Sequence, residues 1–126
     1  MTKLRDIFDY LSTAILVFDA DGRCCYANEA CQTLLVRSLR WLQGRDPGTI
    51  FPLSSEIVAQ CESARADAQS IVLREIEVHL PDWQRSLLLD MNVSPYASDG
   101  QMGVILEMSD RKEVSKLSHD TNTAAI

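Results

Sequence analysis

Long apolar runs and positive charge are the two features that this sequence of 126 residues lacks most clearly. No apolar run approaches the roughly 20 residues that a membrane-spanning helix needs. The first ten residues include Asp6 and Asp9, which are out of place in a signal peptide. We therefore expect a cytoplasmic domain with no membrane contact of its own. Its 12 Lys and Arg residues are outnumbered by 18 Asp and Glu residues, a net charge of −6. We therefore expect no nucleic-acid partner, because such surfaces need clustered basic side chains.

Cysteine pairs of the kind that bind metals or form redox centres are also missing. The sequence has no C-x-x-C pair and no other metal-ligand spacing. A domain of this size buries enough surface to fold without a disulfide or a structural metal. We therefore expect free thiols that pack as small apolar side chains, at Cys24, Cys25, Cys31 and Cys61.

Hydrophobic periodicity predicts strands towards both ends of the chain and helices between them. Strand-like segments occupy residues 14–19, 23–27, 70–80, 85–96 and 101–108. A helix capped by Asn28 ends before Gly44, and a second helix covers residues 54–69. Turns or loops are expected at residues 20–22, 44–48, 81–84 and 94–100. This order predicts an α+β domain in which helices cover one face of an antiparallel sheet.

The alternation in the last three strands predicts which side chains face the helices. In the 70–80 segment, Glu75, Glu77 and His79 are expected on the opposite face. The inward sets are Val72, Ile76, Val78 and Leu80 in this segment, Leu87, Leu89, Met91 and Val93 in the next, and Met102, Val104, Leu106 and Met108 in the last.

Helical spacing of apolar residues predicts that the first 12 residues form an amphipathic helix. Leu4, Ile7, Phe8 and Leu11 share one face at helical spacing, and this face has to be covered. A two-fold dimer is the commonest solution, and Leu88 and Ile105 on the outer sheet face would extend the patch. The alternative is that the helix folds back over its own sheet.

Three local patterns together resemble the PAS (sensory box) family. ILVFDADG at 15–22 and YANEA at 26–30 resemble the opening strand, D-x-x-G turn and x-x-N-x-A ending of PAS domains. LQGR at 42–45 resembles the L-x-G-R before the longer helix of the family. EMSDRK at 107–112 resembles the D-I-T-E-R-K element that closes the last strand, with Glu107 in place of Asp and Ser109 in place of Thr.

The resemblance implies a fold, a domain organisation and a role. It implies a five-stranded antiparallel sheet in the order 2-1-5-4-3, with helices on one face. Residues 1–12 are then an N-terminal helix, residues 13–109 the PAS domain, and residues 110–126 the start of a signalling helix. The implied role is a regulatory sensory or dimerisation module of a bacterial signalling protein, with Glu107 and Ser109 in signal transmission, homodimerisation through the N-terminal helix and a covalently attached output domain.

Neither haem nor flavin is expected as a cofactor. PAS haem sensors carry an axial His on the long helix, and residues 54–69 contain none. Photoactive flavin domains carry N-C-R-F-L-Q, which the EACQTL at 29–34 lacks in most positions. An unidentified small ligand remains an option, against the alternative of a filled core. Residues that would line such a pocket are Phe18, Tyr26, Leu35, Ile57, Cys61, Leu89 and Met91.

No catalytic residues and no metal ligands are predicted. A small enzyme on a similar frame would need a general base in an apolar pocket, and Asp90 is the one candidate, on a strand face expected to point away from the core. A pure interaction module without a ligand is the other alternative.

The tail gives hints about the output domain. Asp120 and Thr123 match the D-x-L-T-G-L start of diguanylate cyclase (GGDEF) domains, whereas His119 and Thr123 match the phosphoacceptor box of histidine kinases. The early strand–helix region also resembles nitrogen-regulation sensor kinases. The short spacing from Glu107 to His119 favours the cyclase as output.

Overall fold

The computed structural model describes residues 13–80 and 85–110 of the chain. The expected N-terminal helix, the turn at 81–84 and the tail after Asp110 lie outside the described residues. The strands are β1 (Ala14–Phe18), β2 (Cys24–Ala27), β3 (Ile71–Leu80), β4 (Arg85–Ser98) and β5 (Gln101–Asp110). The helices are α2 (Glu29–Leu35), α3 (Leu39–Leu42), α4 (Pro47–Ile50) and α5 (Ser55–Asp67).

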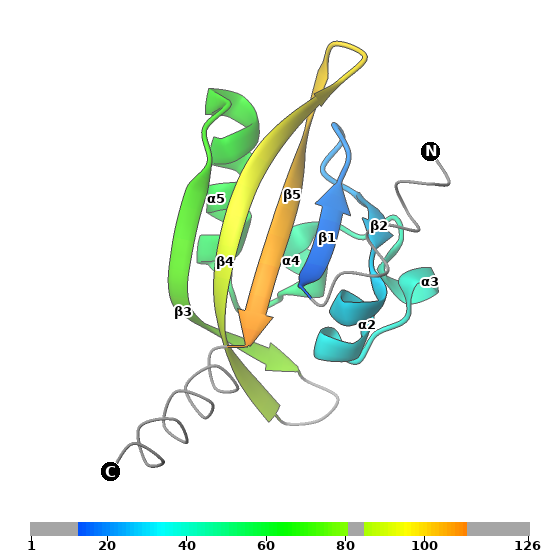
Figure 1. Ribbon diagram of the computed structural model, residues 1–126, viewed down its shortest axis with the longest axis vertical. Coiled ribbons are helices and arrows are strands. Elements are labelled where there is room, and N and C mark those ends of the chain that lie inside the picture. Colours follow the sequence, from blue (N-terminus) through cyan, green and yellow to red (C-terminus); the bar gives the residue numbers. More distant parts are fainter. Residues whose placement is uncertain (1–12, 81–84, 111–126) are drawn as a thin grey trace, which may run out of the picture.

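The strands form one antiparallel sheet in the order β2-β1-β5-β4-β3, as expected (Figure 1). The first and last strands are neighbours, with Leu16 opposite Leu106. This pairing joins the two halves of the chain into one sheet. The helices lie on one face of it, with α5 behind β3 and β4 in Figure 1. The main core fills the space between these helices and the sheet.

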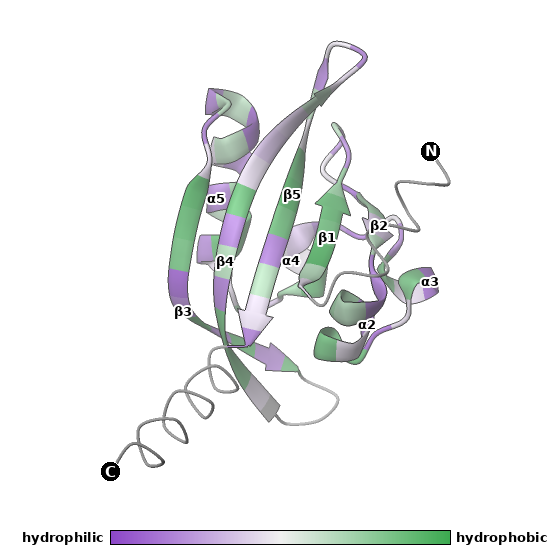
Figure 2. Ribbon diagram, viewed as in Figure 1, coloured by the Kyte–Doolittle hydropathy of each residue, from purple (hydrophilic) through white to green (hydrophobic). Residues whose placement is uncertain are grey.

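β1 is buried along its whole length, which explains why its sequence AILVF is apolar throughout. Leu16 and Phe18 belong to the main core, whereas Ile15 and Val17 belong to a second cluster that also includes Tyr26. Figure 2 shows the corresponding continuous apolar colour along β1. The predicted inward set of β4 is confirmed, since Leu87, Leu89, Met91 and Val93 are all buried in the main core. On β5 the prediction is confirmed for Val104, Leu106 and Met108, whereas Met102 is only half-buried and is not part of that core.

A β-bulge corrects the predicted orientation of Tyr26. Val17 pairs with Tyr26, but the next residue, Phe18, pairs with Cys24. Cys25 is therefore an extra residue in β2, and it shifts the alternation by one position. As a result Cys24 faces the main core, whereas Tyr26 packs in the second cluster, on the other face of the sheet from the helices.

A second bulge corrects the predicted orientation of Val72. The register between β3 and β4 shifts between Leu73 and Ile76, and Glu75 within the bulge has a positive φ of 56°. The residues before the bulge are therefore turned over relative to those after it. Leu73 is buried in the core, and Val72 is 56% exposed. Val78 and Leu80, which follow the bulge, are buried as predicted.

The region predicted as a helix end and a loop contains two further short helices. Val36, in the left-handed conformation, ends α2, and the Ser38 side chain accepts a hydrogen bond from the Trp41 N–H to begin α3. Asp46 caps α4 by accepting a hydrogen bond from the Thr49 N–H. Hydrogen bonds from the Thr49 side chain and from its backbone N–H lower the pKa of the Asp46 carboxyl. An N-cap Asp followed by Pro47 is a helix-start signal. The predicted loop over residues 44–48 is therefore correct for residues 44–46 and wrong from Pro47, where α4 begins.

Candidate functional site

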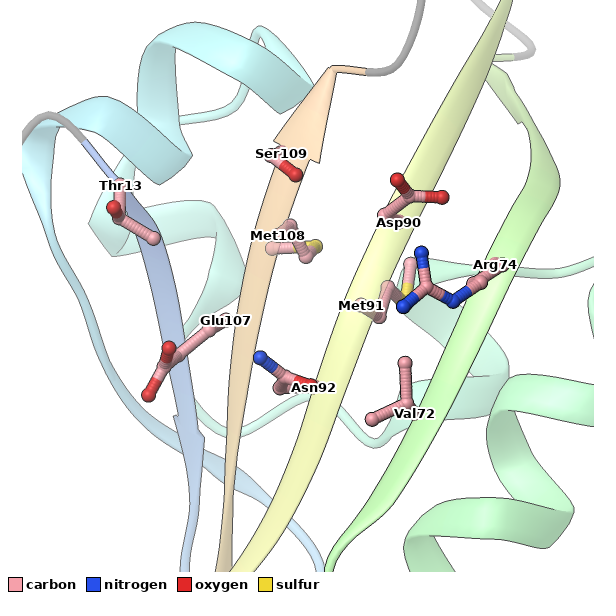
Figure 3. Close-up of a pocket in the computed structure, with 9 residues that line it drawn as sticks. All are labelled: Thr13, Val72, Arg74, Asp90, Met91, Asn92, Glu107, Met108 and Ser109. Carbon is pink, nitrogen blue, oxygen red and sulfur yellow. The ribbon is translucent and has the colours of Figure 1, made fainter.

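A groove of about 320 Å³ crosses the outer face of the sheet, the face away from the helices. Figure 3 shows that its side chains come from the beginning of β1 and from β3, β4 and β5. The residues that line it are Thr13, Val72, Arg74, Asp90, Met91, Asn92, Glu107, Met108 and Ser109. The expected signal-transmission residues Glu107 and Ser109 are therefore both part of it.

The strand register explains how these side chains meet. Asn92 lies opposite Val72 on one side and opposite Glu107 on the other. Asp90 lies opposite Ser109 in the next outward-facing row, which matches the arrangement in Figure 3. Cross-strand neighbours of this kind have Cβ atoms about 5 Å apart, so the side chains of one row lie within reach of one another.

Both ends of the described domain meet at this groove. Ala14 pairs with Met108 across the β1–β5 ladder, so Thr13 lies next to Ser109. The described chain enters the sheet at Thr13 and leaves it at Asp110, one residue after Ser109. The groove is thus bordered by the two points at which further segments are attached.

Asp90 does not face the core, and this bears on the enzyme alternative. Its Oδ1 accepts a hydrogen bond from the backbone N–H of Glu75 at 2.9 Å. The carboxylate thereby supports the left-handed residue of the β3 bulge from the outer face of the sheet. Asp90 therefore has a structural partner and is not placed in an apolar pocket.

Six of the seven expected pocket residues come together in the main core, and one does not. Tyr26 is separated from the others by the sheet. The other six are buried against one another: Phe18, Leu35, Ile57, Cys61, Leu89 and Met91. Phe18 and Cys61 also line a cavity of about 200 Å³ between the β1–β2 turn, α4 and α5. Four carboxylates surround this cavity, those of Asp19, Asp21, Asp46 and Glu62.

Among the described residues, the thiols and the one histidine do not form a metal site. Burial raises the pKa of Cys24 to about 11 and the pKa values of Cys31 and Cys61 to about 12. His79 lies on the surface, 3.6 Å from the Glu77 carboxylate and 3.0 Å from the Ser86 hydroxyl. Within residues 13–80 and 85–110, no group of three His, Cys, Asp or Glu side chains is arranged to hold a metal ion.

A family model described as PAS fold matches residues 8–116 of the chain. The chain belongs to the PAS family. This membership and the observed strand order confirm the fold that the three sequence patterns implied.

Solved structures of PAS domains share this fold at low sequence identity. The PAS domain of nitrogen regulation protein NR(II) from Vibrio parahaemolyticus is 22% identical, with a TM-score of 0.68 over 85% of this chain and 96% of that one. The PAS domain of BvgS from Bordetella pertussis is 19% identical, with a TM-score of 0.70 over 98% and 96%. A PAS domain from Colwellia psychrerythraea is 24% identical, with a TM-score of 0.71 over 86% and 94%. No curated protein matches the sequence significantly.

Many of the PAS domains that resemble this one come from bacterial sensor proteins, including histidine kinases. PAS domains are in general sensory modules of signal transduction. Among the helices of the described residues, none has the length and apolar character needed to cross a bilayer.

Proposed function

We propose that this PAS domain regulates an attached output domain through the groove on the outer face of its sheet. The observation that carries the proposal is that Thr13, Glu107 and Ser109 line one groove, at the place where the flanking segments join the sheet. A change in the position of β1 relative to β5 alters this groove and both junctions together. Transmission then requires that the flanking segments have two arrangements and that the sheet favours one of them.

The N-terminal segment is proposed to make the dimer contact. The apolar side chains Leu4, Ile7, Phe8 and Leu11 would pack between two protomers over the outer sheet face. The exposed apolar residues Val72 and Leu88 on that face support this arrangement. We expect that Ile7→Asp with Phe8→Asp yields a soluble monomer, measured by sedimentation. A native chain that sediments as a monomer at high concentration would refute the dimer.

For the output domain, we propose a histidine kinase, because PAS domains of histidine kinases are among the proteins this chain resembles. The sequence matches at Asp120 and Thr123 are the observation that favours a diguanylate cyclase, and no comparison supports it. The parent protein should transfer phosphate from ATP to its own histidine if the first proposal holds. Conversion of GTP to a cyclic dinucleotide would show the second.

The transmission role is tested on the chain itself by NMR. In Glu107→Ala, amide shifts should change both at residues 13–15 and in the tail after Asp110, because the side chain borders both junctions. Glu56→Ala, which removes an equally exposed carboxylate from α5, is the matched control and should perturb only its own helix. Ile15 is the cross-strand partner of Glu107. If Glu107→Ala perturbs Ile15 but neither Thr13 nor the tail after Asp110, the groove does not couple the two ends.

A ligand in the main core remains a separate proposal. We propose that the cavity beside Phe18 and Cys61 admits at most a small molecule, since its volume is about 200 Å³. A binding metabolite raises the melting temperature by mass action. A thermal-shift screen with the native chain and with Val58→Phe, which narrows the cavity, separates a sensor from a pure interaction module: hits lost in the variant indicate a sensor.

A further inference from the structure

Arginines are concentrated in one part of this acidic domain. Between positions 23 and 45 the chain has four arginines and one acidic residue, Glu29. The rest of the described residues carry twelve acidic side chains and three arginines, and no lysine. Such segregation of charge produces a basic surface on a molecule that is otherwise negative.

Trp41 on α3 orders two of these arginines. The guanidinium carbons of Arg37 and Arg45 each lie 4.1 Å from the centroid of the Trp41 ring. Two cations cannot share one side of a ring at this distance, so they stack on its opposite faces. The Arg45 Nε also donates a hydrogen bond to the Trp41 carbonyl oxygen at 2.5 Å.

Arg23 continues this row towards the sheet. Its Nη1 donates a hydrogen bond to the Gly44 carbonyl oxygen at 3.0 Å, next to Arg45 in the chain. Arg40, also on α3, is exposed beside Trp41. We call these four arginines with Trp41 the arginine surface. It lies at the β2 edge of the sheet, where α3 packs against β2, whereas the groove crosses β3, β4 and β5 (Figure 1).

The stacked arrangement favours binding of carboxylates. Stacking occupies the flat faces of a guanidinium group, whereas its N–H donors point outward in the plane of the group. A side chain already held by a ring and a backbone carbonyl loses less conformational freedom when it binds a partner. Arginine also pairs with carboxylates in a bidentate geometry that lysine cannot reproduce.

We propose that the arginine surface binds an acidic segment of a partner protein, in which Asp and Glu carboxylates pair with the four guanidinium groups. A short acidic segment matches a patch of this extent. A nucleic acid extends further in both directions, over a domain whose other described residues carry twelve acidic side chains and only three arginines, so the charge distribution disfavours it. The partner site is separate from the groove, and its test does not depend on signal transmission.

The test measures the affinity of the native chain for a defined probe. The probe is an eight-residue peptide of alternating Glu and Gly with an uncharged fluorophore, followed by fluorescence anisotropy at low ionic strength. We expect saturable binding that weakens as salt is added. Arg37 and Arg45 are half-buried. Arg37→Gln with Arg45→Gln should weaken binding about tenfold, because two ion pairs at the surface at about 0.7 kcal/mol each amount to that ratio.

Matched variants separate binding from folding. Arg40 is exposed and is not one of the two arginines stacked on Trp41, so Arg40→Glu leaves that stack intact. This substitution should also weaken binding of the peptide, at least about threefold. Arg74→Gln, on the outer sheet face, is the control and should change the affinity less than about twofold. Amide shifts on binding should concentrate at residues 37–45.

Four results would overturn the proposal. The first is equal binding of a peptide with Gln in place of Glu. The second is equal affinity in the arginine variants and in Arg74→Gln. The third is binding of a single-stranded oligonucleotide but not of the peptide, which would assign the surface to nucleic acid. The fourth is self-association that is lost in Arg40→Glu while the peptide does not bind, which would make a second copy of the chain the partner.

Discussion

Asn28 Oδ1 accepts a hydrogen bond from the backbone N–H of Ile15, 2.9 Å away and thirteen positions earlier in the chain. The same oxygen accepts from the Cys31 N–H at 2.9 Å and so caps α2. The Asn28 Nδ2 donates to the Thr13 carbonyl oxygen at 2.8 Å. One fully buried side chain therefore fixes the beginning of β1 against the beginning of α2.

We expect Asn28→Ala to destabilise the domain by about 2–4 kcal/mol. The substitution removes an N-cap, which contributes about 1 kcal/mol, and leaves buried backbone groups without partners at about 1–3 kcal/mol. The free energy of unfolding in urea measures the effect. Ser38→Ala removes the N-cap of α3 at an exposed position, and it should cost no more than about 1 kcal/mol. Equal losses in the two variants would contradict this account.

Gly103→Ala should also destabilise the domain, for a steric reason. A Cβ at Gly103 would lie 2.5 Å from the Tyr96 ring and 2.6 Å from the Phe18 carbonyl oxygen, which is backbone and cannot rotate away. Overpacking of this kind costs about 1–3 kcal/mol, seen as a lower midpoint of thermal unfolding. At Gly48 the added Cβ would meet Val58 at an ordinary 3.8 Å. Gly48→Ala is therefore the control, with little or no loss of stability.

Three of the four thiols should resist modification in the native protein. Burial raises the pKa values of Cys24, Cys31 and Cys61 from 9.0 to about 11 or 12, and the thiolate is the reactive form. At pH 8 we expect an aromatic disulfide reagent to react readily only at Cys25, which is half-buried, and at all four thiols after denaturation. Cys25→Ser should abolish the rapid reaction, and a second fast thiol in that variant would show that the core opens.

The same pKa shifts predict how stability depends on pH. Between pH 9 and about 11 the native state keeps thiol protons that the unfolded chain releases, so the free energy of unfolding falls as the pH rises. Urea titrations at pH 8.5 and 10.5 measure this fall. Cys61→Ala removes one of the shifted groups and should show a shallower dependence than the native chain, even though it is less stable at both pH values.

The β3 bulge makes a prediction about two adjacent residues. Leu73→Ala should cost about 2–4 kcal/mol, because a buried leucine leaves a cavity. Val72→Thr keeps the β-branched shape at a side chain that is 56% exposed, and its effect on unfolding free energy should stay within about 0.5 kcal/mol. A larger loss of unfolding free energy in Val72→Thr than in Leu73→Ala would contradict the bulge. It would mean that Val72 faces the core, as simple alternation along β3 predicts.

The two β-bulges are the features of the sheet that the sequence did not predict. Periodicity located all five strands, because each has an apolar face against the helices or is buried on both faces. An inserted residue changes no hydropathy value, so the bulge at Cys25 and the bulge between Leu73 and Ile76 are not visible in the hydrophobic pattern. For this reason Tyr26 and Val72 were predicted on the wrong face of the sheet. The strand order came from the family resemblance, since local patterns carry no information on which strands pair.

The turn between β4 and β5 is encoded by two adjacent residues, Asp99 and Gly100. The end of β4 was predicted as a loop over residues 94–100, yet β4 extends to Ser98. Pro95 lies beyond Val93, the last β4 residue that pairs with β3, so its missing N–H interrupts no ladder there. Asp99 and Gly100 both have positive φ angles, and this Asp-Gly pair is the signal of a two-residue hairpin turn. For the outer groove, Glu107 and Ser109 were expected from the resemblance, whereas Arg74, Asn92 and Thr13 needed the register.

The pairing of Ala14 with Met108 also determines how the domain responds to a pulling force. β1 begins and β5 ends at the same end of their shared ladder. Tension applied through the two flanking segments therefore loads the β1–β5 hydrogen bonds from that end. Hydrogen bonds then break one after another, as in unzipping, and never all at once as in shear. The domain should consequently yield at low force, however stable it is in denaturant.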